Sequence, residues 1–327
     1  MKHKGMKIAL IIAISALAAG GILLGAGLCL GGSPSFYIDG DGIHVKENTT
    51  AAPKEDYVMK PVKTGTVRKL DLSLLDADVQ IVPGDVWSVE YCLDSEHLEP
   101  VYGFADGVLT LKEGEYDHSR NAAATFGIGD DWWGQEEDYS APYVKITVPE
   151  NGKLEEAVIS SRYGNVEIER TLYATDARIT AENGDIRLEG WKGSGLELQL
   201  KYGSLVSGAL EGARVKADSE NGDLKIGSLN ADAADLKTEY GNLTAEVEKA
   251  DNVDVESKDG SVTLYLDKEM DRYGVNLHTD GGTIRTPEGT VEADGEEGGS
   301  DFIRSQQDVA GLRVCTDYGD IRIREKS

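Results

Sequence analysis

The chain has 327 residues, of which 33 are Lys or Arg and 59 are Asp or Glu, giving a formal net charge of -26. This length allows two ordinary domains or one elongated repeat domain. The acidic balance disfavours binding to nucleic acids or anionic lipid surfaces, so the expected partners are basic proteins or peptides and weakly bound divalent cations.

The N-terminus combines a basic segment with a long apolar run. Residues 1–7 contain Lys2, Lys4 and Lys7, and residues 8–30 form an uncharged, mostly apolar run of 23 residues. As a helix this run would be roughly 34 Å long, enough to cross a hydrocarbon core of about 30 Å. We therefore predict a cytoplasmic tail, a single-pass anchor in the cell membrane, and an extracytoplasmic remainder.

Two other interpretations of this run remain open. A cleaved signal peptide is one, although its apolar region usually has only about 7 to 15 residues. Lipidation of Cys29 is the other, but Leu28 stands where a lipoprotein signal has a small residue. The uncleaved anchor is the favoured interpretation.

The segment after the anchor reads as a stalk followed by strands. Residues 31–66 have a mixed composition, and IDGDGIHV at 38–45 is typical of a small hairpin. Residues 67–152 alternate apolar and polar side chains, which predicts strands that continue or cap a larger sheet system. Residues 115–139 break this alternation and form a predicted insertion.

From residue 153 to residue 327 one short sequence motif recurs. SRYGNVEI at 161 and AENGDIRL at 181 are two examples, each with a glycine between runs of alternating apolar residues. The predicted turn glycines are Gly164, Gly184, Gly203, Gly222, Gly241, Gly260, Gly282 and Gly319. The first five steps between them are 20, 19, 19, 19 and 19 residues, which indicates a repeat architecture.

Two all-β folds satisfy this repeat. In an antiparallel meander each Asn-Gly would be a hairpin turn, whereas in a β-solenoid each unit of about 19 residues would be one coil. The constant period favours the solenoid, because stacked coils need equal lengths to stay in register. In that case Leu205, Leu224, Leu243 and Val262 form one parallel ladder. In either fold the glycines at the turns can take positive φ.

The residue before each turn glycine alternates between an aromatic ring and a short polar side chain. The series is Tyr163, Asn183, Tyr202, Asn221, Tyr240 and Asp259. These positions continue the inward phase of the preceding strand, so we expect them to close one edge of the core.

Two features of the distal part interrupt the repeat. Residues 287–300 are rich in Gly and Glu and poor in apolar residues, which predicts a flexible loop that replaces or interrupts one unit. Cys92 and Cys315 lie far apart in the sequence, and we expect two thiols rather than a disulfide.

No motif for catalysis or cofactor binding occurs in the sequence. The five histidines are scattered singly, so zinc and iron sites have no support, and no cofactor is predicted. Asp185, Asp223 and Asp320 follow turn glycines, where aspartate is a common turn residue. Asp39 and Asp41 resemble the start of a calcium loop, but Thr50 stands where such a loop has Glu.

Trp132 and Trp133 are the predicted contact site for a protein or cell-wall partner. They are adjacent within the acidic insertion, and aromatic side chains often dominate the energy of interfaces. The alternative is that one or both fold back against the solenoid.

The turn phrases, the LDLSLLDADVQIVPGD opening and the ITVPENGKLEEAVIS passage carry a family resemblance. Residues of about 67 to 324 resemble the putative-adhesin family of bacterial envelope proteins, which includes LiaG-like proteins encoded with cell-wall stress systems. The resemblance implies a β-solenoid-like fold and no catalytic residues. We therefore predict a non-catalytic envelope protein for adhesion, binding or stress-related scaffolding. The alternatives are a glycan-acting β-solenoid enzyme and a surface protein that binds divalent cations.

Overall fold

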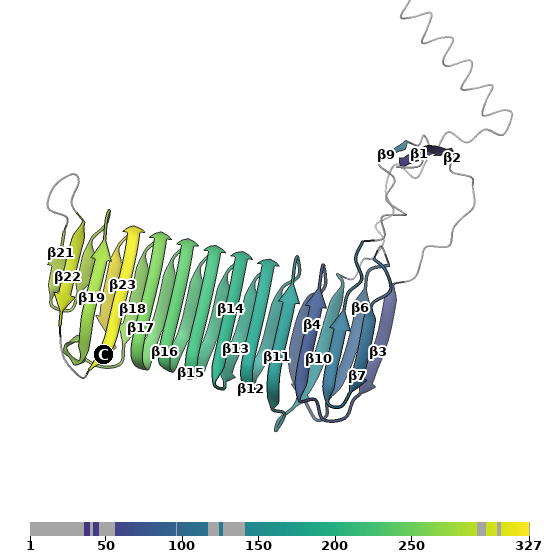
Figure 1. Cartoon of the computed structure of the whole chain (residues 1–327), viewed down its shortest axis with the longest axis horizontal. Helices are drawn as coiled ribbons and strands as arrows, with labels where there is room; N and C mark the ends of the chain where they lie inside the picture. The colour runs from purple at the N-terminus through teal and green to yellow at the C-terminus, as the bar shows by residue number, and fades with distance from the viewer. Residues whose placement is uncertain are drawn as a thin grey trace, which may run out of the picture. The chain divides into compact units, whose positions relative to one another are not determined.

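The computed structural model in Figure 1 describes residues 36–39, 42–45, 56–95, 97–116, 124–126, 141–292, 299–305 and 309–326. The predicted anchor at 8–30 and the pair Trp132 and Trp133 lie outside these ranges. Within them, no helix is long and apolar enough to cross a membrane. The chain divides into two compact units, residues 1–55 with 116–140, and residues 56–115 with 141–327.

The first unit contains a small antiparallel sheet. Strand β1 (Phe36–Asp39) pairs with β2 (Gly42–Val45), which confirms the predicted hairpin. On its other side β1 pairs with β9 (Ala124–Phe126), so a strand of the predicted insertion joins a strand of the predicted stalk.

The second unit is a stack of β-strands, whose bounds are as follows. The N-terminal part has β3 (Tyr57–Lys63), β4 (Lys69–Leu74), β5 (Asp78–Gly84), β6 (Ser88–Leu93), β7 (Val101–Ala105), β8 (Val108–Lys112) and β10 (Tyr143–Pro149). The repeat region has β11 (Leu154–Ser161), β12 (Val166–Asn183), β13 (Ile186–Lys192), β14 (Gly195–Tyr202), β15 (Leu205–Asn221), β16 (Leu224–Tyr240), β17 (Leu243–Asp259) and β18 (Val262–Leu266). The C-terminal part has a 3-10 helix (Met270–Arg272), β19 (Tyr273–Thr279), β20 (Ile284–Thr286), β21 (Gly289–Val291), β22 (Ser300–Arg304), β23 (Ala310–Tyr318) and β24 (Ile321–Glu325).

The predicted solenoid is confirmed by the register of the strands. Leu205 pairs with Leu224, Leu224 with Leu243, and Leu243 with Val262, and all three pairings are parallel. A meander would pair the strands antiparallel within each unit, so it is excluded. Figure 1 shows the coils standing side by side from β12 to β18.

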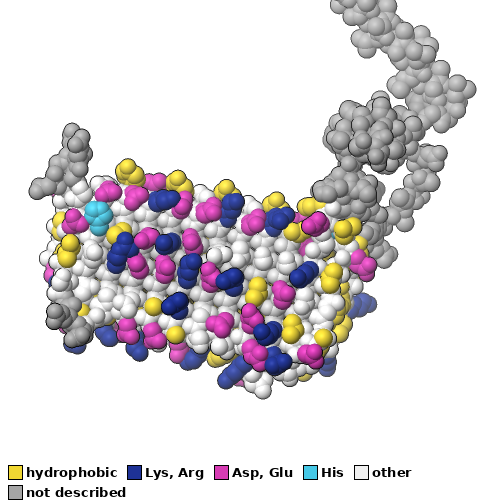
Figure 2. Space-filling model, viewed as in Figure 1, with side chains coloured by type: hydrophobic (Ala, Val, Ile, Leu, Met, Phe, Trp, Pro, Cys, Tyr) yellow, Lys and Arg dark blue, Asp and Glu magenta, His cyan; other side chains and the backbone are white. Residues whose placement is uncertain are grey.

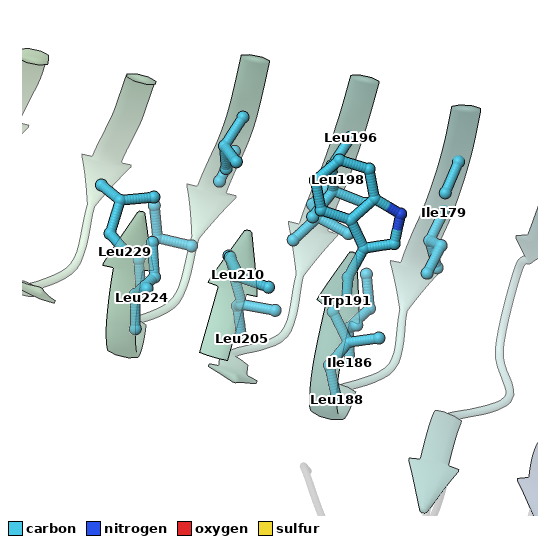
Figure 3. Packing of buried hydrophobic residues seen from close by; sticks show 14 of the residues in the cluster. Ile179, Ile186, Leu188, Trp191, Leu196, Leu198, Leu205, Leu210, Leu224 and Leu229 are labelled. Carbon is cyan, nitrogen blue, oxygen red and sulfur yellow. The ribbon is translucent and has the colours of Figure 1, made fainter. Parts of the chain in front are cut away.

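The core lies between the two strand layers of each coil. In β16, for example, Leu224, Ile226 and Leu229 are buried from the first half of the strand, and Leu236 from the second half. Trp191 is the largest fully buried side chain, and Figure 3 shows it among the leucines of neighbouring strands. The ladder therefore keeps apolar residues at equivalent inward positions of successive coils.

The turn glycines are required for close stacking, and all but one of them stack without the positive φ that glycine allows. Only Gly222 has a positive φ, at 151°. A Cβ on Gly203 would lie 2.1 Å from the carbonyl oxygen of Gly184, and one on Gly260 would lie 1.9 Å from that of Gly241. Each coil therefore passes too close to the next for any side chain at this position.

The polar residue after each glycine holds neighbouring coils together. Asp185 Oδ1 accepts the backbone N–H of Ser204 at 3.0 Å, and Asp223 Oδ1 accepts that of Asn242 at 2.7 Å. The same contact recurs from Asn165 to Asp185 and from Asn242 to Ser261. These side chains thus serve turn structure, as expected, but their partners lie in the next coil rather than in their own turn.

The C-terminal coil is inserted between two coils that precede it in the sequence. Strand β23 pairs in parallel with β17 on one side and with β19 on the other, and β24 pairs likewise with β18 and β20. The turn glycines therefore stack in the order Gly260, Gly319, Gly282. Figure 1 shows the yellow C-terminal strand beside β18 and β17.

Residues 287–300, predicted to form a flexible loop, include strand residues where they are described. Gly289–Val291 is strand β21, which forms an antiparallel hairpin with β20, and Ser300 begins β22. Residues 293–298 lie outside the described ranges. The backbone partners of β21 and β22 are supplied by β20 and β19 respectively.

Antiparallel strands close both ends of the stack. At the N-terminal end β6 pairs antiparallel with β10, β3 with β6, and β7 with β8. At the other end β22 pairs antiparallel with β19. Edge strands are sites of unwanted pairing, and Pro61 in β3 removes one backbone donor there. The antiparallel strands at the N-terminal end come mostly from residues 67–152, which agrees with the prediction that this region continues or caps the sheet.

Candidate interaction surface

Four tyrosines form an exposed row along the edge where the turn glycines stack. We call this row the tyrosine edge; its members are Tyr163, Tyr202, Tyr240 and Tyr318, with exposed fractions of 54%, 52%, 53% and 67%. The expectation that these rings close the core is wrong. The edge of the core is closed by the residues two positions earlier, namely Ser161, Ala181, Leu200, Ser219, Thr238, Ser257 and Thr316. Figure 2 shows hydrophobic side chains at intervals along the upper edge of the molecule.

The rings occupy every second coil. Asn183 pairs with Tyr202, Tyr202 with Asn221, and Asn221 with Tyr240. Asp259 then pairs with Tyr240 and with Tyr318. Because strands stack about 4.8 Å apart, successive tyrosines are about 9.6 Å apart along the edge. Tyr318 continues this spacing only because its coil is inserted next to that of Asp259.

The backbone that carries the tyrosine edge is fixed on both sides. The N–H of Gly222 donates to the Tyr240 carbonyl at 3.0 Å, and that of Gly260 donates to the Tyr318 carbonyl at 3.1 Å. On the core side of the edge, the buried hydroxyl of Thr316 donates to the Gly260 carbonyl at 3.3 Å. A row anchored in this way loses little backbone entropy when it binds a partner.

Short polar side chains separate the rings. The Asn183 side-chain amide donates to the Arg162 carbonyl at 3.2 Å, and that of Asn221 donates to the Lys201 carbonyl at 3.4 Å. Asp259 occupies the third such position, between Tyr240 and Tyr318, and its carboxylate can only accept hydrogen bonds. The surface between the last two rings is therefore acidic rather than neutral.

Charges flank the row unevenly. Glu182 lies 3.7 Å from Arg162, and Glu239 lies 2.6 Å from Lys258, so these carboxylates are neutralised locally. The Lys201 ammonium lies 5.8 Å from the centre of the Tyr202 ring, which shows that this ring face accepts a cation.

Three further carboxylates beside the row have no such partner. Glu220, Asp259 and Asp317 are exposed and form no ion pair within the described ranges. The tyrosine edge therefore presents ring faces beside three carboxylates that form no ion pair, although the charge of Asp317 acts on nearby Lys258 and helps to raise its pKa.

A buried histidine lies beside the turn of the N-terminal coil, next to the start of the row. The His97 side chain is 1% exposed, with Nε2 3.0 Å from Asp76 and Nδ1 2.8 Å from the Gly114 carbonyl. Glu113 accepts the backbone N–H of Leu75 at 2.6 Å. Burial by itself lowers the pKa of His97, but the contacts with Gly114 and Asp76 and the charge of Glu113 outweigh it, so the pKa is raised.

We expect His97 to make the stability of the protein depend on pH. Its unfolded pKa is about 6.5 and its folded pKa is higher, so the stabilisation is fully present below about pH 6.5. It is lost as the pH rises through the folded pKa. Urea unfolding of the wild type and of His97→Gln over a pH series measures this contribution as the difference between the two proteins. A difference that does not change with pH would contradict the assignment.

The structure tests the other sequence-predicted sites only in part. Asp185, Asp223 and Asp320 each accept a backbone N–H from a neighbouring coil. Asp39 lies in β1, whereas Asp41 lies outside the described ranges. Where residues are described, no group of three or more His, Cys, Asp or Glu side chains is arranged to hold a metal ion. Cys92 and Cys315 do not form a disulfide with each other.

A shallow cavity of about 550 Å³ lies at the C-terminal end of the stack. Its lining is Arg285, Thr286, Pro287, Arg322, Ile323, Arg324 and Glu325. Two of the guanidinium groups, of Arg285 and Arg322, pair with Asp320 at 2.7 and 2.5 Å. The lining contributes one carboxylate, so this cavity does not offer the pair of carboxylates expected of a glycan-cleaving groove.

The parallel coils, the antiparallel caps and the rigid aromatic edge define the class of this protein as a capped β-solenoid. The chain belongs to the Toastrack DUF4097 family, whose sequence model matches residues 67–324. The match covers the same residues as the resemblance inferred from the turn motifs, and that resemblance is confirmed.

Several solved structures are similar to this chain. A putative adhesin from Parabacteroides distasonis ATCC 8503 is 16% identical, with 83% of this chain and 98% of that chain covered and a TM-score of 0.44. A putative adhesin from Parabacteroides merdae ATCC 43184 is 14% identical, with 84% and 97% covered and a TM-score of 0.42. A putative adhesin from Bacteroides fragilis NCTC 9343 is 12% identical, with 84% and 98% covered and a TM-score of 0.37. No curated protein sequence matches the chain.

Proposed function

We propose that this protein is a non-catalytic binding module of the cell envelope. It attaches the cell surface to a partner through its tyrosine edge. The observation that carries the proposal is the row of half-exposed rings, Tyr163, Tyr202, Tyr240 and Tyr318, on a backbone fixed by the neighbouring coils. Tyrosine is enriched at interfaces because its ring buries apolar area while its hydroxyl stays hydrogen-bonded. A row whose backbone is already fixed loses little backbone entropy on binding.

The proposed location follows from the N-terminal sequence. Residues 8–30 are uncharged and mostly apolar, and the preceding basic residues favour a cytoplasmic N-terminus. The solenoid then lies outside the membrane, where a partner can reach its edge. Protease added to intact cells is expected to digest the solenoid and to leave a short membrane-bound fragment. Full protection of the solenoid in intact cells would contradict this topology.

Binding to isolated cell walls tests the function. We expect the full chain to sediment with the walls, and Tyr202→Ser with Tyr240→Ser to weaken this binding by about tenfold or more, as for interface anchors. The matched control replaces two outward side chains away from the edge, Val206→Ser with Tyr265→Ser. Equal losses in both variants would contradict the assignment to the edge. Release of soluble sugars from the walls would favour the alternative of a glycan-acting enzyme.

Trp132 and Trp133 remain the second candidate for the partner contact. Their prediction rests on the sequence of the acidic insertion. In the same sedimentation assay, Trp132→Ala with Trp133→Ala separates this contact from the tyrosine edge. A loss confined to the tryptophan variant would move the proposed contact to the insertion.

A further inference from the structure

We propose that the tyrosine edge binds a basic, proline-rich polypeptide in the polyproline II conformation. This inference rests on the proposed binding function and names the chemistry of its ligand. It follows from three properties of the edge: the spacing of the rings, their hydrogen-bonding capacity and the placement of unpaired carboxylates.

The spacing of the rings matches the repeat of a polyproline II helix. Successive tyrosines are about 9.6 Å apart, because they occupy every second coil. A polyproline II helix has 3 residues per turn and a rise of 3.1 Å, which gives a repeat of about 9.3 Å. Over the three intervals from Tyr163 to Tyr318 the mismatch accumulates to only about 0.9 Å. Every third residue of such a ligand can therefore meet a ring.

The chemistry of the edge complements a proline-rich backbone. Prolines have no N–H, so such a ligand mainly offers carbonyl oxygens and flat pyrrolidine rings. The tyrosine hydroxyls can donate to those carbonyls, and the ring faces can pack on the pyrrolidines. Aromatic grooves that recognise proline-rich segments elsewhere use this combination. Asn183 and Asn221 lie between the rings, and their side-chain amides donate to backbone carbonyls of the preceding coil.

The charge distribution specifies basic residues in the ligand. Asp259 lies in register between Tyr240 and Tyr318, exposed Asp317 lies next to Tyr318, and exposed Glu220 lies on the coil between Tyr202 and Tyr240. Lys258 is the basic side chain next to Asp259 in the sequence, and it is already paired with Glu239. None of the three carboxylates forms an ion pair among the described residues. A guanidinium or ammonium group placed there meets two aromatic faces and a carboxylate together. We expect the basic side chain of the ligand to lie between Tyr240 and Tyr318.

Two other occupants fit the edge less well. A second copy of this chain would bring the same acidic edge and another net charge of -26, which opposes association. A neutral polysaccharide could stack on the rings, but it would gain nothing from the three unpaired carboxylates. Charge complementarity therefore favours the basic peptide.

A synthetic peptide of Pro-Pro-Arg repeats tests the proposal directly. About 12 residues extend over roughly 37 Å in the polyproline II conformation. The row itself spans about 29 Å. Fluorescence anisotropy with the full chain in detergent micelles measures the affinity. We expect the Pro-Pro-Arg peptide to bind at least about tenfold more tightly than a Gly-Ser-Arg peptide, which has the same charge but a flexible backbone.

Two variants locate the contact. Tyr202→Ser with Tyr240→Ser is expected to weaken binding of the Pro-Pro-Arg peptide by about tenfold or more. Asp259→Asn is expected to weaken it about three- to tenfold while leaving the affinity for a Pro-Pro-Ala peptide unchanged. This second change is conservative, because Asn183 and Asn221 occupy the equivalent positions of two other coils.

The outcomes separate this inference from the proposed function. Equal binding of the Pro-Pro-Arg and Gly-Ser-Arg peptides would overturn it, because charge alone would then suffice. Tyrosine-dependent sedimentation with cell walls but no binding of the Pro-Pro-Arg peptide would also overturn it, while leaving the proposed function intact. Competition by a β-linked polysaccharide, with no effect of Asp259→Asn, would assign the edge to a glycan instead.

Discussion

Deleting residues 310–327 is expected to destabilise the protein by roughly 6 to 12 kcal/mol, because four fully buried side chains are lost at about 1.5 to 3 kcal/mol each. These side chains are Leu312, Val314, Ile321 and Ile323. Their coil lies in the middle of the C-terminal stack, between β17 and β19 and between β18 and β20. The deletion therefore separates two coils and exposes the core on both sides, an effect comparable to the entire stability of a typical domain.

Urea unfolding and limited proteolysis measure this effect. We expect residues beyond Leu266 to become protease-sensitive in the deletion variant. The control removes only Lys326 and Ser327, which loses the exposed ion pair between Lys326 and Glu246 and the hydrogen bond from the Lys326 N–H to the Leu266 carbonyl, but no buried side chain. If the longer deletion merely frayed the end, with β19 still protected, the inserted position of the coil would be wrong.

Replacing Gly241 by Ala is expected to destabilise the protein by about 3 kcal/mol, at the upper end of the usual range for overpacking. The new Cβ would lie 2.2 Å from the carbonyl oxygen of Gly222. Backbone must move to relieve this contact, and the same movement stretches the hydrogen bonds from Gly222 to Tyr240 and from Gly241 to Asp259. Thermal and urea unfolding measure the loss.

Gly103→Ala is the matched control for this substitution. A Cβ at Gly103 meets nothing within 4 Å, and Gly103 is not among the glycines with positive φ. We expect a change of less than about 0.5 kcal/mol there, as for an open surface site. Similar losses for the two variants would mean that the cost of Gly241→Ala does not come from the stacking of coils.

Trp191 shows how the stack accommodates an irregular core residue. Its side chain is 1% exposed, and a Cβ on Gly212 of the next coil would lie 2.5 Å from its ring. Gly193 gives the ring space in the same way, at 2.6 Å. The contact of these glycines with the indole exists only once the coils are stacked, so the sequence gives no sign of it.

Much of the architecture could be predicted from the sequence because it depends on local periodicity. Alternating apolar residues predict strands whatever their partners, and the 19-residue spacing of Gly203, Gly222, Gly241 and Gly260 predicts coils of equal length. Equal coils placed in register then require the parallel ladder from Leu205 to Val262 that the structure contains. The polar turn residues were also correctly assigned to structure.

The tyrosine edge was only half predictable. The alternation of Tyr and Asn before the turn glycines is visible in the sequence. Whether these side chains point into the core or toward solvent is not. Continuing the inward phase of the strand placed Tyr202 and Tyr240 inside, whereas the chain turns outward at these positions and leaves both rings half exposed. The geometry of the bend, which depends on contacts between coils, decides the direction of the side chain.

Periodicity along the chain thus predicts the strands, the coil length and the identity of the turn residues, and it favours the parallel register of the central coils. Contacts between coils place Gly319 between Gly260 and Gly282, make Tyr318 extend the row, and pair residues 289–291 as a strand. These pairings cannot be deduced from the sequence, because the edge of a strand can pair with any segment that has free backbone groups and a matching alternation of apolar and polar residues. Which segment fills it depends on the packing of the whole stack rather than on the order of residues in the chain.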